Sequence, residues 1–87
     1  MIIAIDPGDV QSAFVVMDGK FNIVDKGLED NYTMKAYLEQ EGAPYDKLII
    51  EGVASYGMPV GRTVFETCIW IGRFIEAWGG DFELMYR

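Results

Sequence analysis

Short hydrophobic runs, each ended by turn residues, open this chain. The first run covers residues 2–5 and is followed by Asp6 and a Pro-Gly pair. Because this run is short and β-branched, it predicts a central strand that is buried on both faces. Two further apolar runs, over 12–17 and 21–26, are joined by an Asp-Gly turn, which is a strong hairpin signal. We expect these three strands to form an antiparallel meander, with the third strand nearer a sheet edge.

A helix and a second buried strand are predicted next. Helix-capping residues at 29–31 precede Met34, Tyr37 and Leu38, which fall on one face of an amphipathic helix. Residues 47–53 then repeat the buried-strand pattern. Because a helix crosses over between the third strand and this fourth one, the fourth strand can lie parallel to the first and beside it.

The last third of the chain is predicted to be a loop, a long helix and a strand. Gly and Pro are frequent over 54–61, apolar residues surround much of a helix over 62–78, and apolar and polar residues alternate over 82–86. No repeat or linker interrupts this order. The whole of 1–87 is therefore expected to form one α/β domain.

Composition narrows the class of protein. Hydrophobic residues make up 51% of the chain, and no run reaches the roughly 18 residues that span a bilayer, so we expect a soluble globular domain. No secretory apolar region or basic leader precedes the first strand, which points to the cytoplasm. One cysteine cannot form an internal disulfide, and the lack of histidine excludes Cys-His metal sites and Ser-His-Asp triads. Catalysis would have to rest on carboxylates, hydroxyls, Lys, Arg or a metal.

The net charge sets a second limit. A formal charge of -7 argues against a general nucleic-acid coat, because clustered Lys and Arg normally bind phosphate, and the seven basic residues of this chain are scattered. An acidic protein can still act on phosphodiesters if its carboxylates hold divalent cations that face the phosphate.

Two of the predicted buried strands carry a carboxylate near their C-terminal ends, Asp6 and Glu51. Such a group loses hydration, which a cation or a set of hydrogen-bond donors must replace. Neighbouring parallel strands lie about 4.8 Å apart, so acids at matching heights can share one or two metal ions. Taken alone, Asp6 is equally consistent with a turn residue, because Asp-Pro-Gly is ordinary turn chemistry.

The segment Ile-Ala-Ile-Asp6-Pro7-Gly8, followed by a strand of small residues, resembles the opening of RuvC-type Holliday junction resolvases. Leu-Ile-Ile-Glu51 resembles their second acidic strand, at the expected place in the order. The order of elements is that of the ribonuclease H-like fold. The resemblance therefore implies a five-stranded mixed sheet in the order 3-2-1-4-5, with helices packed on it.

The same resemblance implies a function. Asp6 and Glu51 would be two of the catalytic, metal-binding carboxylates of an endonuclease that requires Mg2+ or Mn2+ and cleaves branched DNA, such as a four-way junction. In that family further acids come from a helix after the fifth strand, and no residue follows Arg87. We therefore expect the N-terminal part of a longer nuclease, inactive by itself because its site is incomplete.

Other residues are candidates for contacts with nucleic acid or for structural roles. Tyr56, in the loop beyond the second acid, can stack on an unpaired base, and Arg62 and Arg73 are candidate phosphate contacts. Asp9 and Glu66 are expected to be solvated.

The helix over 62–78 carries apolar residues around more of its circumference than one sheet face can cover. Cys68 on this helix is expected to be a small buried hydrophobic residue. Resolvases of the family are typically dimers, so the resemblance implies a homodimer through this helix. Its expected anchors are Phe65, Ile69 and Trp70.

Three alternatives remain open. An actin-like or sugar-kinase phosphate-binding fold shares this sheet, but its phosphate hairpin usually has Thr or Ser where this chain has Asp9, and 87 residues are too few for two lobes. An RNA-processing nuclease of the same fold shares the Asp-Pro-Gly opening. In a non-catalytic, nucleic-acid-binding module, Asp6 and Glu51 would form hydrogen bonds only. A metal titration separates this last alternative from the nucleases.

Overall fold

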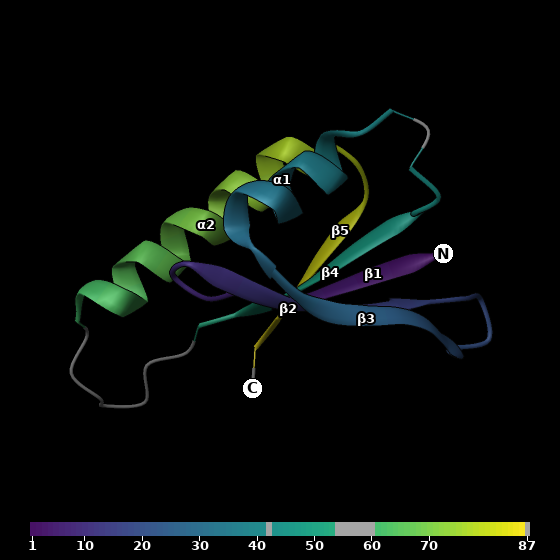
Figure 1. Ribbon diagram of the computed structural model, residues 1–87, viewed down its shortest axis with the longest axis horizontal. Helices are drawn as coiled ribbons and strands as arrows, with labels where there is room; N and C mark the ends of the chain where they lie inside the picture. The colour runs from purple at the N-terminus through teal and green to yellow at the C-terminus, as the bar shows by residue number, and fades with distance from the viewer. Residues whose placement is uncertain (42, 54–60, 87) are drawn as a thin grey trace.

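The computed structural model describes residues 1–41, 43–53 and 61–86. Five strands and two helices follow one another in this part of the chain (Figure 1). They are β1 (Ile2–Asp6), β2 (Gln11–Met17), β3 (Ile23–Asp30), α1 (Asn31–Glu39), β4 (Lys47–Gly52), α2 (Arg62–Trp78) and β5 (Phe82–Tyr86). Neither helix is long and apolar enough to cross a membrane.

All five strands form one mixed sheet in the order β3-β2-β1-β4-β5. The pairs β1–β2 and β2–β3 are antiparallel, whereas β1–β4 and β4–β5 are parallel. Strand β1 is central because the meander brings β2 to one side and the crossover through α1 brings β4 to the other. The predicted fold class and strand order are confirmed.

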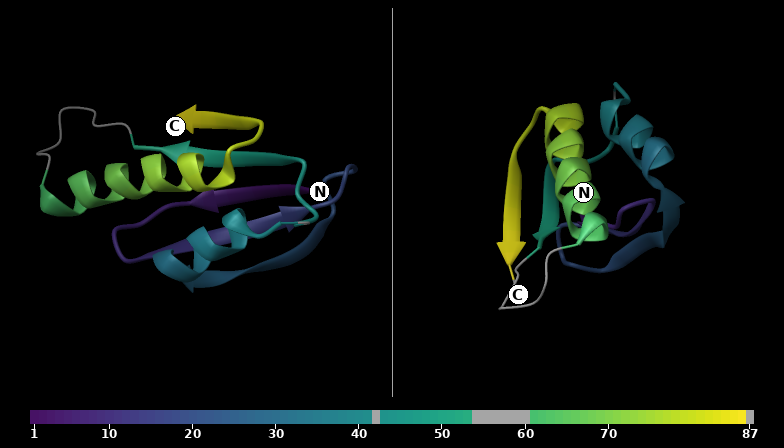
Figure 2. Two further views of the ribbon diagram at one scale, coloured as in Figure 1. Left: turned by 90° about the horizontal axis from the view of Figure 1, so that it is seen from above. Right: turned by 90° about the vertical axis from the view of Figure 1, so that its left-hand side faces the viewer.

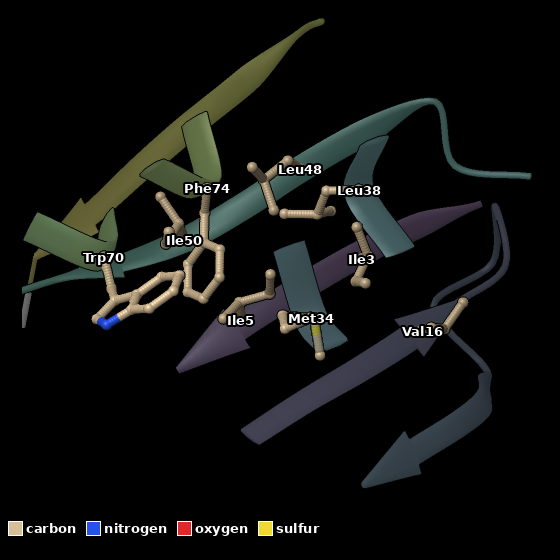
Figure 3. Close-up of a cluster of buried hydrophobic side chains, with 9 residues drawn as sticks. All are labelled: Ile3, Ile5, Val16, Met34, Leu38, Leu48, Ile50, Trp70 and Phe74. Atoms are coloured by element: carbon tan, nitrogen blue, oxygen red, sulfur yellow. The ribbon is translucent and has the colours of Figure 1, made fainter. Parts of the chain in front are cut away.

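Both helices cover the same face of this sheet, as Figure 2 shows. Side chains that point toward them are fully apolar on the two central strands: Ile3 and Ile5 on β1, and Leu48 and Ile50 on β4, are at most 2% exposed. Helix residues close over these side chains, and Figure 3 shows the resulting core. The helix contribution consists of Met34, Leu38, Trp70 and Phe74.

The prediction that β1 and β4 are buried on both faces is wrong for the described residues. Burial alternates along each strand, because every second side chain points away from the helices and is only partly covered. An uninterrupted apolar run therefore does not show that both faces are covered.

Helix α2 is turned differently from the sequence prediction. Its buried residues are Thr67, Trp70 and Phe74, and Cys68, predicted to be buried, is exposed. The reason is the neighbouring helix: the ring of Trp70 meets Tyr32 of α1 edge-on, with 4.9 Å between centroids. Contact with α1 as well as with the sheet fixes which part of a broad apolar surface is buried.

The first hairpin turn is longer than predicted. The carbonyl of Asp18 accepts from the Phe21 N–H, and its carboxylate accepts from the Lys20 and Asn22 N–H groups. The positive φ of the turn falls on Phe21, at 62°, and β3 begins at Ile23. Asp-Gly therefore marked the turn correctly but not its length.

Candidate functional site

The face of the sheet opposite the helices carries both predicted acids. Since Ile5 and Ile50 point toward the helices, the next residue of each strand, Asp6 or Glu51, points to the other face. Ile5 is the register partner of Ile50 in the parallel β1–β4 pair. Asp6 and Glu51 are therefore the residues directly after one register pair of two adjacent strands, at the matching heights that the sequence predicts.

Both carboxylates line one hollow of about 330 Å³ on this face. Asp6 is exposed and Glu51 is half-buried. The rest of the lining is mainly apolar and comes from four strands: Ala4, Ile5, Ala13, Val15, Ile49, Met85 and Tyr86. Glu51 is thus partly shielded from water by apolar neighbours, which favours its attraction for a cation, whereas Asp6 is open to solvent.

The donor set fits part of a magnesium or manganese site. Both metals prefer oxygen ligands, and a Mg2+ ion usually binds one or two carboxylates and completes its octahedron with water and substrate phosphate oxygens. Among residues 1–41, 43–53 and 61–86, no group of three or more acids or cysteines is placed to hold a metal. Asp6 and Glu51 can therefore supply two ligands, and a two-cation site requires more.

The turn after Asp6 is held by a buried polar network that the sequence did not reveal. The Gly8 N–H donates to Ser12 Oγ at 3.3 Å, and the Ser12 hydroxyl donates to Asn31 Oδ1 at 2.6 Å. The Asn31 amide then donates to the Gly8 carbonyl at 2.9 Å. The sequence predicts only a helix-capping role for Asn31, because a hydrogen bond across 19 residues leaves no local signal.

Gly52, at the end of β4, is a second residue whose role the sequence did not reveal. A Cβ atom added at Gly52 would lie 2.4 Å from Cε1 of Tyr86, so the ring of Tyr86 occupies space that any other residue at 52 would fill. Gly52 is the register partner of Tyr86 in the β4–β5 pair. The absent side chain at 52 thus leaves room for the ring of Tyr86, a residue that also lines the hollow.

Neither of the remaining site candidates within the described residues lines the hollow that holds the two acids. Tyr56 is outside the described residues. Arg62 begins α2 and is 92% exposed, with an ion pair of 3.9 Å to Glu66. Arg73 stacks its guanidinium 4.7 Å from the ring centroid of Trp70, and α2 packs on the face of the sheet opposite the acids. Phosphate contacts by these residues remain predictions.

Comparison with known proteins gives a fold and no family. No protein-family model matches the sequence, and no similar curated protein was found. A solved structure of Thermus thermophilus RuvC in complex with a Holliday junction substrate matches 99% of this chain with a TM-score of 0.72 and 10% identity. Another Thermus thermophilus RuvC structure matches 98% with a TM-score of 0.69 and 12% identity.

This chain spans 65% and 63% of the length of those two structures. At such low identity the likeness concerns the fold alone. The RuvC-like, ribonuclease H-like architecture expected from the sequence is thereby confirmed.

Proposed function

We propose that this chain belongs to a divalent-cation-dependent endonuclease of the RuvC type, which hydrolyses phosphodiesters in branched DNA. The observation that supports this proposal is the position of Asp6 and Glu51, which directly follow the register pair Ile5–Ile50 of two adjacent parallel strands. The fold that carries them is shared with RuvC structures. One of those structures is a complex with a Holliday junction substrate, so a four-way junction is the substrate class that we propose.

In this proposal Asp6 and Glu51 are the catalytic carboxylates and hold Mg2+ or Mn2+ through their oxygens. Bound cations of this kind activate water for attack at phosphorus and stabilise the leaving oxygen. The chain contributes two acids, placed at the ends of hydrogen-bonded strands beside a mainly apolar hollow. No side-chain nucleophile is needed.

We further propose that the missing protein ligands come from a segment that packs on the uncovered face of the sheet, beside Ala13 and Val15. Both of these side chains line the hollow and are only partly buried. A segment placed there would cover apolar surface and bring its own acids to Asp6 and Glu51. Residues 1–87 alone are then expected to bind cations weakly.

A Mn2+ titration followed by amide NMR tests the cation site, because paramagnetic broadening detects a site with millimolar affinity. We expect broadening centred on the ends of β1 and β4, and its loss in Asp6→Asn. Glu76→Gln is the matched control, since Glu76 is an exposed acid on α2, on the far side of the sheet. Absence of broadening at millimolar Mn2+, or unchanged broadening in Asp6→Asn, would support the non-catalytic alternative.

A cleavage assay tests the incomplete site. Residues 1–87 are incubated with a labelled four-way junction and Mn2+, and we expect no cleavage. Robust cleavage that Glu51→Gln abolishes would show that no further ligands are required. Structured RNA tested in parallel, with a longer chain that supplies the missing acids, distinguishes a junction resolvase from an RNA-processing nuclease.

A homodimer through α2 is a separate part of the proposal. Phe65 and Ile69 are 61% and 49% exposed on the outer side of this helix. Trp70 is only 5% exposed within the core of its own chain, so the expectation that it anchors a partner is wrong. A two-fold dimer would bury Phe65 and Ile69 and supply the two active sites that symmetric junction cleavage needs.

A further inference from the structure

Two buried polar side chains form hydrogen bonds with the backbone of Gly8. Ser12 accepts from the Gly8 N–H, and Asn31 donates to the Gly8 carbonyl. We infer that Ser12 and Asn31 are positioning residues, which hold the turn after β1 so that Asp6 is oriented for a cation before one binds. This inference rests on the proposed cation site and assigns it two supporting residues that do not touch the ion themselves.

The burial of these two residues is the first argument. Ser12 and Asn31 are each 1% exposed, and a buried hydroxyl or amide is unfavourable unless it forms hydrogen bonds. Each of them bonds both to the other and to Gly8, through the Gly8 N–H and the Gly8 carbonyl respectively. The two side chains therefore satisfy their polar atoms by fixing one specific backbone position.

The second argument is the position of Gly8 relative to Asp6. Asp6 is the last residue of β1 and is held on one side by its antiparallel register with Ala13. Only Pro7 separates it from Gly8, and a proline ring fixes φ, so the direction of the chain leaving Asp6 depends on where Gly8 is held. A Cβ added at Gly8 would lie 2.3 Å from the carbonyl oxygen of Gln11, which shows how closely this turn is packed.

A third contact ties the turn to helix α1. Asn31 is the first residue of this helix, and its backbone N–H donates to the carbonyl of Val10 at 2.9 Å. One residue thus holds the turn through its side chain at Gly8 and through its backbone at Val10. Supporting hydrogen bonds of this kind keep metal ligands in the geometry that the ion requires.

The test measures Mn2+-induced broadening of amide NMR signals in wild type, Ser12→Ala and Asn31→Asp. Ser12→Ala removes the acceptor of the Gly8 N–H. Asn31→Asp keeps the shape of the side chain but cannot donate to the Gly8 carbonyl. We expect broadening per added Mn2+ to fall by about 10- to 100-fold in both variants, at a temperature where circular dichroism shows each to be folded.

Asp30→Ala is the matched control. It removes the N-cap of α1, because Asp30 accepts from the Thr33 N–H and hydroxyl, and it leaves every hydrogen bond of Ser12 and Asn31 intact. We expect a lower melting temperature with wild-type broadening. If Asp30→Ala loses broadening as Ser12→Ala does, general loosening of α1 explains the effect and the inference is overturned.

The remaining outcomes separate the inference from the proposed function. Wild-type broadening in Ser12→Ala would overturn the positioning role and leave the cation site standing. No broadening in wild type would overturn both. Amide exchange in the unmodified chain gives an independent check that does not depend on whether a variant folds: the Gly8 N–H should be protected, and exchange at the rate of an open loop would contradict the network.

Discussion

The two faces of the sheet are made by alternate residues of the same strands, yet they differ in burial and in the chemistry of their side chains. On the helix face, Ile3, Ile5 and Ile50 are at most 2% exposed. On the opposite face, Asp6 and Glu51 stand at the end of a partly covered apolar surface. Strands β1 and β4 thus each contribute to stability with one set of side chains and to the candidate site with the other.

This difference means that stability and cation binding can be changed separately. A side chain on the helix face is enclosed by both helices, so shortening it leaves a cavity. A side chain on the hollow is already in contact with solvent, so a similar change removes little buried surface. Substitutions on the two faces should therefore have effects of different size and kind.

The largest expected effect comes from Phe74→Ala, a substitution on α2 in the core that covers the helix face. Phe74 is 0% exposed and packs against Trp70 at 5.6 Å between ring centroids. Phe→Ala in a core costs roughly 3–5 kcal/mol, which is a large part of the free energy of unfolding of a small domain. Urea denaturation should show a chain close to unfolding, and Phe74→Leu should recover much of the loss.

Met85→Ala is the counterpart on the open face. Met85 is 52% exposed and lines the hollow. Changes at such positions usually alter stability by about 0.5 kcal/mol or less. A loss as large as that of Phe74→Ala would mean that the open face is covered in solution, for example by a second copy of the chain.

A smaller effect is expected from Ile69→Asp, which tests the proposed dimer. Sedimentation at micromolar concentration should show a dimer for the wild type and a monomer for the variant, because a carboxylate in an apolar interface loses its hydration. Since Ile69 is half exposed in its own chain, circular dichroism should show an unchanged fold. A monomeric wild type contradicts the dimer, and a dimer that persists in Ile69→Asp places the interface elsewhere.

Sequence patterns predicted the sheet because its determinants are local. Short β-branched runs and the crossover were sufficient for the order β3-β2-β1-β4, and the place of the fifth strand followed from the resemblance to the ribonuclease H-like fold. The capping residue Asp30 marked the start of α1. The matching heights of Asp6 and Glu51 in the sheet were predicted because each acid lies near the C-terminal end of its strand.

Contacts between distant segments could not be predicted in the same way. The apolar surface of α2 is so broad that its period alone does not define a buried face, and Trp70 and Phe74 are buried where α2 meets both α1 and the sheet. This is why Cys68 is exposed and Trp70 is buried. The bond between Ser12 and Asn31 likewise depends on β2 and α1 being brought together.

The smallest expected effect concerns pH and the N-cap of α1, on the helix side of the sheet. The hydroxyl and backbone N–H of Thr33 donate to the carboxylate of Asp30 and hold its pKa below the ordinary value of 3.8. Because the folded state then binds fewer protons than the unfolded state, this cap stabilises the fold above pH 3.8. The stabilisation should disappear as pH falls through the lower pKa of the folded chain.

Melting temperatures of wild type and Asp30→Asn, followed from neutral pH to below the folded pKa of Asp30, measure this contribution. Asparagine keeps an acceptor oxygen for the Thr33 N–H but does not titrate, so the advantage of the wild type should shrink as Asp30 becomes protonated. The change should be small, since Asp30 is exposed and water weakens its interactions. A constant difference across the whole pH range would show that the charge of Asp30 does not contribute, and that the cap acts through hydrogen-bond geometry alone.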